Sequence, residues 1–257
     1  MKHTSIFYKF DKILLPQPSV FVDKGDYEVF KSPEYNFYRL ANGIFIFNSK
    51  GISLDTWEHR YWKFFSPNQT KHTHFSFFQD HKTENLFKEA QQRYREVHAH
   101  PLMVTSLYDK KFTISETKLS FSQILGDMDW LKYHEFLSKI HSKNHWVLND
   151  GYKILKKISQ DLGVYRFLCF DRENNIVGSF ANIKKNNVVR FENFEISPSF
   201  RNKGFGKITL QFALKHAKES LQADYVVLTS SNKLNAQRLY LQSQFKVISN
   251  KITLLNY

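Results

Sequence analysis

The most informative part of the sequence is VVRFENFEISPSFRNKGFGKITLQFALKHA, residues 188–217. It starts with the β-branched and aromatic residues of a strand and ends with the apolar spacing of a helix. Between them lies FRNKGFGK, residues 200–207, which holds two glycines and three cations in a chain with 9 glycines among 257 residues. Glycines so spaced before a helix suit either a surface turn or an anion-binding loop.

The anion-binding alternative has a clear physical basis. The first turn of a helix offers N–H groups without intrahelical partners, at the positive end of the helix dipole. Glycine lets the backbone approach a pyrophosphate, and Lys203 and Lys207 add positive charge. The spacing matches neither G-x-x-x-x-G-K-S/T nor the three-glycine dinucleotide fingerprint. On spacing alone, a turn and a phosphate site are equally good interpretations.

The elements around this loop follow a regular order. Apolar periodicity and β-branched content predict α-α-β-β-β-α-β-α-β for the C-terminal part of the chain. The predicted helices cover residues 127–141, 150–163, 204–221 and 233–244, and the predicted strands cover residues 164–170, 175–183, 186–196, 224–230 and 245–255. Gly163 is a natural left-handed stop for the second helix.

The N-terminal part predicts the shorter order β-α-β-α-β. Its predicted elements are a strand pair or one long bent strand over residues 36–48, helices over 53–65 and 83–95, and strands over 73–79 and 97–108. Ser53 and Thr83 stand where helix caps are expected. The apolar pattern breaks between residues 108 and 120, so we divide this α/β (α+β) chain into domains 1–112 and 113–257.

The stretch over residues 188–217 resembles the acyl-CoA-binding motif of the GCN5-related N-acetyltransferase (GNAT) family. Its matching pattern is Arg201-x-x-Gly204-x-Gly206, after a strand that ends in EISP. Downstream, DYVVLTSSNKLNAQRLYLQSQF is similar to the family's next strand and helix, where an Ala-x-x-Leu-Tyr pattern ends at Tyr240. The resemblance covers roughly residues 117 to 257.

The resemblance implies a GNAT fold, a central mixed sheet flanked by helices, with acetyl-CoA as the acyl donor. The N-terminal half resembles the domain that precedes the acetyltransferase module in two-part members of the family. It lacks the Arg-x-x-Gly-x-Gly pattern, which makes it a degenerate GNAT-like domain without a donor site. Such a domain would pack against the active module or shape the acceptor pocket.

The resemblance also implies which residues hold the donor. The pantetheine arm would pair with the backbone of Phe194, Glu195 and Ile196, while Arg201 either orients the loop or pairs with a phosphate. The pyrophosphate would sit on the N–H groups of Asn202, Lys203, Gly204, Phe205, Gly206 and Lys207.

Two positions depart from the family pattern. Lys233 stands where the family has a cofactor-contacting asparagine, with Asn232 and Asn235 nearby as substitutes. Gln244 replaces a glycine that the family has four residues after its tyrosine, so we expect a different turn there.

The resemblance places Tyr240 near the thioester sulfur. A CoA thiolate leaves during transfer, and a phenol within reach can protonate it. The acceptor amine must lose a proton, and Glu192 on the preceding strand is the leading candidate for the base, with Glu195 second. Two alternatives stay open, because Tyr240 also suits a core aromatic and Glu192 also suits an ion pair with Arg190 or Lys184.

Composition limits the function classes. With 42% hydrophobic and 16% aromatic residues the chain is not a disordered one. It has no apolar run long enough to span a membrane, and its first residues lack the features of a signal peptide. The single cysteine, Cys169, sits in an apolar run and is expected to be a buried thiol. Together these features favour a cytoplasmic protein.

The net charge of +13 invites a polyanionic partner, but the cations are scattered rather than clustered, which argues against a nucleic-acid-binding module. Histidine pairs such as His72 and His74, His98 and His100, and His141 and His145 lack a third ligand at diagnostic spacing, so we expect no metal.

The leading hypothesis is an acetyl-CoA-dependent N-acetyltransferase whose amine acceptor, a small molecule or a protein, is unidentified. A non-catalytic acyl-CoA sensor or scaffold is the alternative, and a homodimer is compatible with both. A basic RNA-associated protein is a third reading. In the family, the segment that holds His141, His145, Trp146 and Tyr152 lines the acceptor pocket.

Overall fold

The computed structural model describes residues 4–35, 38–66, 72–112, 118–142, 147–231 and 234–256. Its chain divides into two compact units. The first comprises Met1–Met103, Thr229–Gln237 and Val247–Tyr257, and the second comprises Val104–Leu228 and Arg238–Lys246. The predicted domains divide the chain at one point. In the structure, by contrast, the first unit also contains two later segments, residues 229–237 and 247–257. No helix in the described part of the chain is long and apolar enough to cross a membrane.

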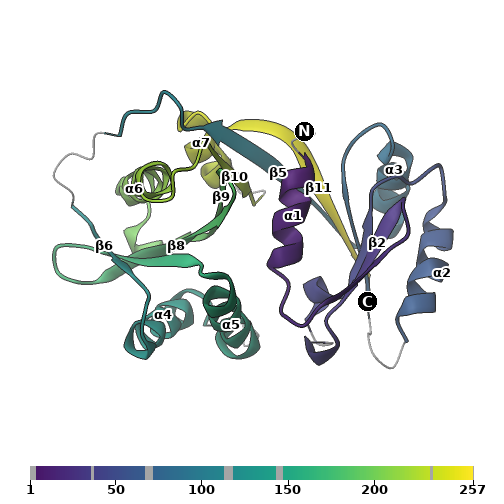
Figure 1. Cartoon of the computed structure of the whole chain (residues 1–257), viewed down its shortest axis with the longest axis horizontal. Coiled ribbons are helices and arrows are strands. Elements are labelled where there is room, and N and C mark those ends of the chain that lie inside the picture. The colour runs from purple at the N-terminus through teal and green to yellow at the C-terminus, as the bar shows by residue number, and fades with distance from the viewer. Residues whose placement is uncertain are drawn as a thin grey trace. The chain divides into compact units, whose positions relative to one another are not determined.

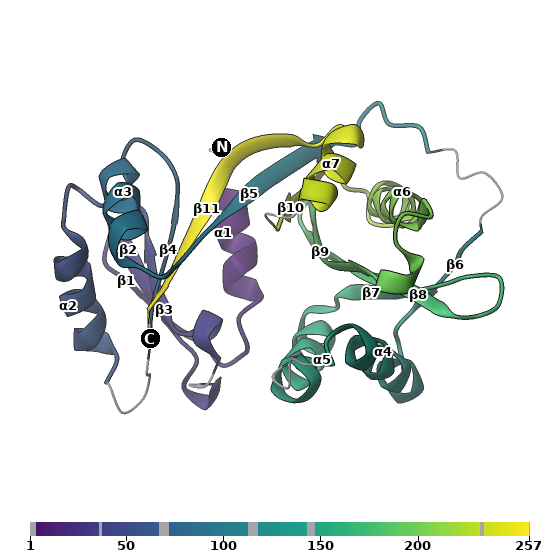
Figure 2. The ribbon, with the colours of Figure 1, turned by 180° about the vertical axis from the view of Figure 1, so that it is seen from behind.

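The first unit contains a mixed sheet with helices on both faces. The elements are α1 (Thr4–Ile13), β1 (Val20–Asp23), β2 (Tyr27–Lys31), two 3-10 turns η1 (Pro33–Tyr35) and η2 (Arg39–Ala41), β3 (Gly43–Ile46), α2 (Leu54–Phe64), β4 (Thr73–Phe78), α3 (Glu84–Arg93), β5 (Glu96–Ser106) and β11 (Lys246–Asn256). The strand order is β1-β2-β3-β4-β11-β5. In Figures 1 and 2, α1 lies on one face of these strands, and α2 and α3 lie on the other.

The chain's last strand belongs to this first unit. β11 pairs antiparallel with β4, with Leu254 opposite Phe75, and both side chains are fully buried. β3 and β4 are parallel, as a strand–helix–strand connection through α2 requires. The unit's core is made by the inner side chains of these strands and by α2 and α3, including Trp57 and Tyr61.

The predicted β-α-β-α-β order is present as β3-α2-β4-α3-β5, with three differences in detail. Residues 39–48 hold the turn η2 and the short strand β3 rather than a strand pair, and α1, β1 and β2 precede them unpredicted. Ser53 caps α2 by accepting from the Thr56 N–H. Thr83 occupies the cap position of α3 but donates its hydroxyl to the Phe78 carbonyl at 2.8 Å, so it does not cap the helix.

In the described part of the second unit, five strands lie in the order β10-β9-β8-β7-β6. Its elements are β6 (Ser120–Gln123), α4 (Asp127–Ile140), a π-helical turn η3 (Val147–Gly151), α5 (Tyr152–Leu162), β7 (Tyr165–Phe170), β8 (Ile176–Lys185), β9 (Val188–Ile196), a 3-10 turn η4 (Pro198–Phe200), α6 (Phe205–Glu219), β10 (Tyr225–Thr229) and α7 (Leu234–Gln242). The predicted order of elements is confirmed, with β6 added before it. Gly163 ends α5 in the left-handed conformation, φ 60°, as predicted.

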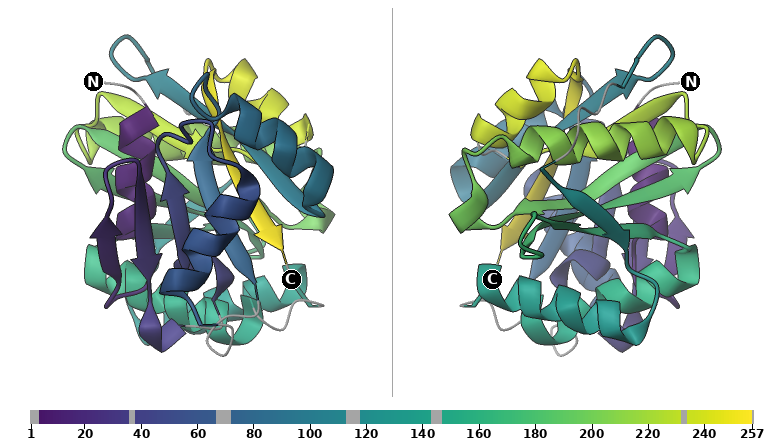
Figure 3. Two further views of the ribbon diagram at one scale, coloured as in Figure 1. Left: turned by 90° about the vertical axis from the view of Figure 1, so that its right-hand side faces the viewer. Right: turned by 90° about the vertical axis from the view of Figure 1, so that its left-hand side faces the viewer.

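Helices cover both faces of these strands. α4 and α5 lie on one face and α6 on the other (Figures 1 and 3). On the α6 side, Phe180 of β8 stacks on Phe167 of β7 at 5.0 Å between ring centroids and contacts Phe212 of α6. Cys169 is buried as expected, and burial raises the pKa of its thiol to about 12, so it is unreactive at neutral pH.

Candidate acyl-donor site

The two parallel strands of the second unit stop pairing part of the way along β9. The register runs from Val188 opposite Tyr225 to Arg190 opposite Val227, and no pair follows in the described residues of the two strands. β9 continues to Ile196. Its N–H and C=O groups on this edge are therefore open to another extended chain.

A bulge sits at the point where the strands part. Ala181 of β8 lies opposite Glu192, but Ser179 lies opposite Glu195, so β9 holds one extra residue. Asn193 takes the left-handed conformation there, φ 49°. Asparagine tolerates that region better than most residues.

The bulge changes which side chains share a face. Simple alternation would pair Glu192 with Phe194. Instead Phe191 and Phe194 lie 5.3 Å apart between ring centroids, and both contact the ring of Tyr240, at 6.5 and 6.3 Å. Glu192 is left on the opposite face from Phe194. The bulge therefore reverses the phase that simple alternation predicts for this end of the strand.

The glycine loop ends in an uncapped helix. Asn202 and Gly204 both have left-handed backbone, φ 61° and 81°, and Gly204 is the N-cap of α6 without a side chain to fill the role. Among the described residues, no acceptor bonds the N–H groups of Asn202, Lys203, Gly204, Phe205 and Gly206. The Lys207 N–H differs from prediction, because it donates to the Gly204 carbonyl at 3.1 Å within the helix's first turn.

Two side chains hold or flank the loop. Arg201 Nε donates to the carbonyl of Ile196 at 3.0 Å, which favours the orienting role over the phosphate-pairing one. The Lys203 ammonium lies 5.2 Å from the centre of the Phe200 ring. Gly206 faces inward, since a Cβ there would lie 3.5 to 3.8 Å from Leu239, Phe194 and Ile196. A larger side chain at Gly206 would fill the space beside the open edge of β9.

Tyr240 is 7% exposed and packs between β9 and Phe245, whose ring lies 5.7 Å away. Its hydroxyl has no hydrogen-bond partner among the described residues. Burial raises the pKa of Tyr240 above its ordinary value, and the nearby Glu192 carboxylate raises it further. The phenol therefore stays protonated at neutral pH and can donate a hydrogen bond.

The two glutamates of β9 have different partners. Glu192 is ion-paired with Arg190, two residues earlier on the same strand, as one of the sequence alternatives had it. Glu195 is bonded through both carboxylate oxygens to Nε2 of His141, at 3.0 and 2.9 Å. His141 directly follows the last residue of α4. Its contact with Glu195 joins residues that are 54 positions apart in the sequence.

A buried arginine reaches the bulge from two strands away. Arg166 on β7 lies opposite Ala181, and that small residue lies opposite Glu192. The Arg166 side chain, 2% exposed, bonds to the Asn193 side-chain oxygen at 3.3 Å through both terminal nitrogens. Its further acceptors are Tyr133 Oη at 3.1 Å and Ser159 Oγ at 3.4 Å.

The remaining predicted residues are placed less tightly. Asn235 is exposed on α7, whereas Asn232 and Lys233 lie outside the described residues. Gln244 has left-handed backbone, φ 66°, which is the conformation that glycine favours. The different turn that we expected from the replacement of glycine by glutamine is therefore not seen. Tyr152 bonds to the Trp130 carbonyl at 3.2 Å, and His145 and Trp146 are not described. In the described part of the chain no cluster of three metal-ligating side chains occurs.

Sequence reasoning missed the roles of Arg166 and of the contact between His141 and Glu195. No periodic or motif signal links His141 to Glu195, since their proximity comes from the packing of α4 against the sheet. Arg166 carried one usable signal, a cation within the otherwise apolar strand VYRFLCF. A charge in that position is buried and must find partners.

Comparison with known proteins supplies the family and the fold. Residues 130–245 match the model of the acetyltransferase (GNAT) family. A GCN5-related N-acetyltransferase from Kribbella flavida is similar over 100% of this chain and 95% of its own, with TM-score 0.68 and 11% identity. A functionally unknown conserved protein from Staphylococcus epidermidis ATCC 12228 is similar over 91% and 92%, with TM-score 0.67 and 14% identity.

A tandem GNAT protein from the clavulanic acid biosynthesis pathway is similar over 94% of this chain and 84% of its own, with TM-score 0.60 and 8% identity. None of the curated proteins matches the chain in sequence. The full-length structural similarities confirm the predicted fold.

Proposed function

Because the chain belongs to the GNAT acetyltransferase family through residues 130–245, we propose that it transfers an acetyl group from acetyl-CoA to a primary amine. One observation carries the proposal. The uncapped start of α6, with five N–H groups that have no acceptor among the described residues, lies next to the open edge of β9. A pyrophosphate fits the first feature, and an extended pantetheine amide chain fits the second.

The donor would be held mainly by backbone. We propose that the N–H groups of residues 202–206 bind the pyrophosphate and that residues 194–196 of β9 pair with the pantetheine arm. Lys203 and Lys207 add charge from exposed positions, and Arg201 fixes the loop to the end of β9. Asn232 and Asn235 remain proposed secondary contacts of the donor. A backbone cradle suits acyl-CoA because its amides are preorganised before the donor arrives.

Tyr240 is the proposed proton donor to the departing CoA thiolate. A thiolate's conjugate acid has a pKa near 8.5, so a protonated phenol can stabilise or protonate the leaving group. The buried position of Tyr240 keeps it in that protonated state. On the acceptor side, the predicted base Glu192 stays a proposal together with Glu195, and both lie on the face of β9 opposite Phe194.

The proposal is tested by measuring acetyl-CoA binding by calorimetry and thiol release with primary amines. We expect binding in the micromolar range and acetylation of at least one amine. Tyr240→Phe should slow turnover by about 10- to 100-fold and leave the acetyl-CoA Kd within about twofold. Tyr225→Phe, which alters an exposed tyrosine of the same unit, is the matched control.

Two results would contradict the proposal in different ways. Normal turnover by the Tyr240→Phe variant would remove Tyr240 from the mechanism. Tight acetyl-CoA binding without transfer to any amine would instead identify a non-catalytic acyl-CoA sensor.

A further inference from the structure

A histidine–carboxylate pair lies on the α4 face of β9, opposite the face that contacts Tyr240. His141 ends α4, and its Nε2 bonds both oxygens of Glu195 at 3.0 and 2.9 Å. Each side chain is 29% exposed, so the pair is reachable from solvent. We infer that His141, oriented by Glu195, takes the proton from the acceptor amine. This inference rests on the proposed acetyl transfer and names its base.

The hydrogen bond fixes which ring nitrogen is free. A carboxylate accepts hydrogen bonds but cannot donate them, so the His141 Nε2 carries the proton that Glu195 receives. The neutral imidazole then has its lone pair on Nδ1. No described residue bonds that nitrogen. A base held by a carboxylate behind it is the arrangement that activates nucleophiles in catalytic triads.

The position of Glu195 relates the pair to the donor. Glu195 stands between Phe194 and Ile196, the residues proposed to carry the pantetheine arm on their backbone. Its side chain points to the α4 side of the sheet, whereas Phe194 points to Tyr240 on the other side. The proton acceptor and the proton donor therefore lie on opposite faces of β9. In the proposed transfer, the amine would approach from the α4 face and the thiolate would leave toward Tyr240.

Glu192 shares the face of Glu195 but is differently engaged. Its carboxylate is ion-paired with Arg190 on the same strand, whereas Glu195 binds an imidazole ring. Two other titratable groups lie around the pair, Tyr133 of α4 and Arg166 of β7. Burial raises the pKa of Tyr133, and the Glu195 carboxylate raises it further. Tyr152 of α5 packs on the ring of His134, which lies about two helical turns before His141 in α4.

The proposed step balances in protons and electrons. A primary ammonium gives one proton to His141 Nδ1 and becomes a neutral amine. The resulting imidazolium is stabilised by Glu195. The amine lone pair forms the C–N bond while the C–S bond of the thioester breaks, and the sulfur keeps the electron pair until Tyr240 protonates it. The amide nitrogen loses its second proton to water, and water returns a proton to the Tyr240 phenolate. His141 then returns its own proton to water.

The experiment combines substitution with chemical rescue. His141→Gly and His141→Gln are assayed with acetyl-CoA and three probe amines: butylamine, 1,4-diaminobutane and a short peptide with a free N-terminus. We expect kcat to fall by about 100- to 1,000-fold while the acetyl-CoA Kd stays within about twofold. Added imidazole should restore part of the activity of His141→Gly, and glycine is well tolerated at a helix C-terminus. Glu195→Gln should lower kcat by about tenfold.

The matched control is His98→Gln. His98 is an exposed histidine of the first unit that also faces a glutamate, Glu96, at 3.5 Å, and we expect its substitution to leave turnover unchanged. Wild-type turnover by either His141 variant, or a loss that imidazole does not restore, would overturn the inference. If the wild-type protein acetylated none of the amines, the proposed function itself would fail.

Discussion

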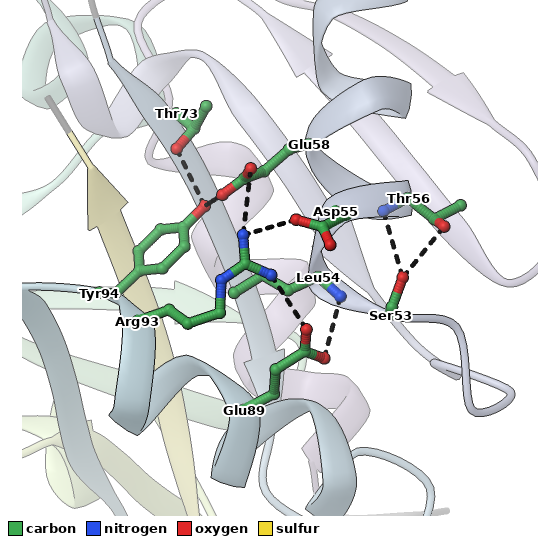
Figure 4. Close-up of polar contacts among 9 residues, drawn as sticks. All are labelled: Ser53, Leu54, Asp55, Thr56, Glu58, Thr73, Glu89, Arg93 and Tyr94. Atoms are coloured by element: carbon green, nitrogen blue, oxygen red, sulfur yellow. Dashed lines mark hydrogen bonds and ion pairs between the residues drawn. The ribbon is translucent and has the colours of Figure 1, made fainter.

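Each unit has one helix that follows a strand and leads to a parallel strand. The N–H groups at the start of the helix are bonded by side chains in the first unit and are left without acceptors among the described residues in the second. α2 and α6 both connect a pair of parallel strands, β3 to β4 and β9 to β10. At the start of α2, Ser53 Oγ accepts from the Thr56 N–H, and the Glu89 carboxylate accepts from the Leu54 N–H at 3.0 Å (Figure 4). At the start of α6 the corresponding N–H groups have no acceptor among the described residues.

The α2 terminus is enclosed by a network of the protein's own charges. Arg93 of α3 holds Asp55 at 2.6 Å, Glu89 at 3.1 Å and Glu58 at 3.7 Å (Figure 4). Tyr94 continues the network by donating to Glu58 at 2.9 Å. The anion positions at this helix start are thus filled by carboxylates.

This contrast between the two helix starts indicates where an external anion can bind. A strand–loop–helix unit offers a positive helix terminus in either unit of the chain. In the first unit carboxylates of the same chain satisfy that terminus and would repel a phosphate, whereas in the second unit it stays open. The comparison supports the prediction that the N-terminal half has no donor site of its own.

The largest effect is expected from a matched pair of glycine substitutions. Gly204 and Gly51 both have positive φ, 81° and 69°, and neither has an atom within 4 Å of an added Cβ. A valine should strain both loops by about 1–2 kcal/mol. Only Gly204→Val should weaken acetyl-CoA binding, by about 100-fold or more in calorimetry, because it displaces the amides of the α6 start. Equal loss of binding by Gly51→Val would break the comparison.

The second effect concerns the strands that lead into the two helices. β3 pairs with β4 in regular register, but β9 is bulged at Asn193. We expect Arg166→Met to lower the free energy of unfolding by about 2–3 kcal/mol, because it removes the donor to the buried Tyr133 and Ser159 and to the half-buried Asn193. Turnover should fall further than acetyl-CoA affinity, since the bulge sets the faces of Glu192 and Glu195.

Two further variants of this bulge separate packing from charge. Arg166→Lys keeps the charge but not the planar fork, and should recover part of the stability and little of the turnover. Asn193→Gly allows the left-handed backbone while removing the oxygen that Arg166 binds. Denaturant unfolding and steady-state kinetics report both. Full activity in Arg166→Met would show that the bulge holds without the arginine.

A smaller effect is expected in the charge network of the first unit. Glu89→Ala removes the acceptor for the Leu54 N–H and one partner of Arg93, and should cost about 1 kcal/mol of unfolding free energy. Acetyl-CoA affinity should not change. Glu84→Ala is the control, because it removes only an exposed pair with Lys88 and should cost a few tenths of a kcal/mol. A change in the acetyl-CoA Kd of Glu89→Ala would link the two helix termini.

The sequence predicted the second unit better than the first for a physical reason. Its strands and helices are long and bounded by glycine and asparagine turns, so their periodicity is unambiguous. β1, β2 and β3 are four or five residues long, and such short runs carry too few repeats to distinguish a strand from a turn. The helix over 53–65 was predictable because Ser53 and the apolar spacing agree.

At the site, the sequence carried the loop and Tyr240 but not the geometry between elements. The glycines and their spacing are local, and so they could be read directly. The phase of β9 depends on Asn193, which Arg166 of β7 holds through a long-range contact. The pairing of Glu195 with His141 depends in turn on that phase. Local pattern could suggest each residue but could not choose between Glu192 and Glu195.

The smallest effect is expected at the ends of α3 and α7. Tyr94 ends α3 with extended backbone, whereas Gln244 follows α7 with φ 66°, and the Phe245 N–H bonds the Tyr240 carbonyl at 3.0 Å. A left-handed glutamine costs more than a left-handed glycine, although glycine loses more chain entropy on folding. Gln244→Gly should therefore stabilise the protein by about 0.5 kcal/mol in thermal or denaturant unfolding.

The control for this last substitution is Asn174→Gly in the turn between β7 and β8. Asn174 has φ 62°, but asparagine is already tolerated there, so the gain should be close to zero. Because the Thr105 hydroxyl binds the backbone carbonyl of Gln244 at 3.1 Å, that contact survives the substitution. Destabilisation by Gln244→Gly would therefore mean that the glutamine side chain itself holds the turn.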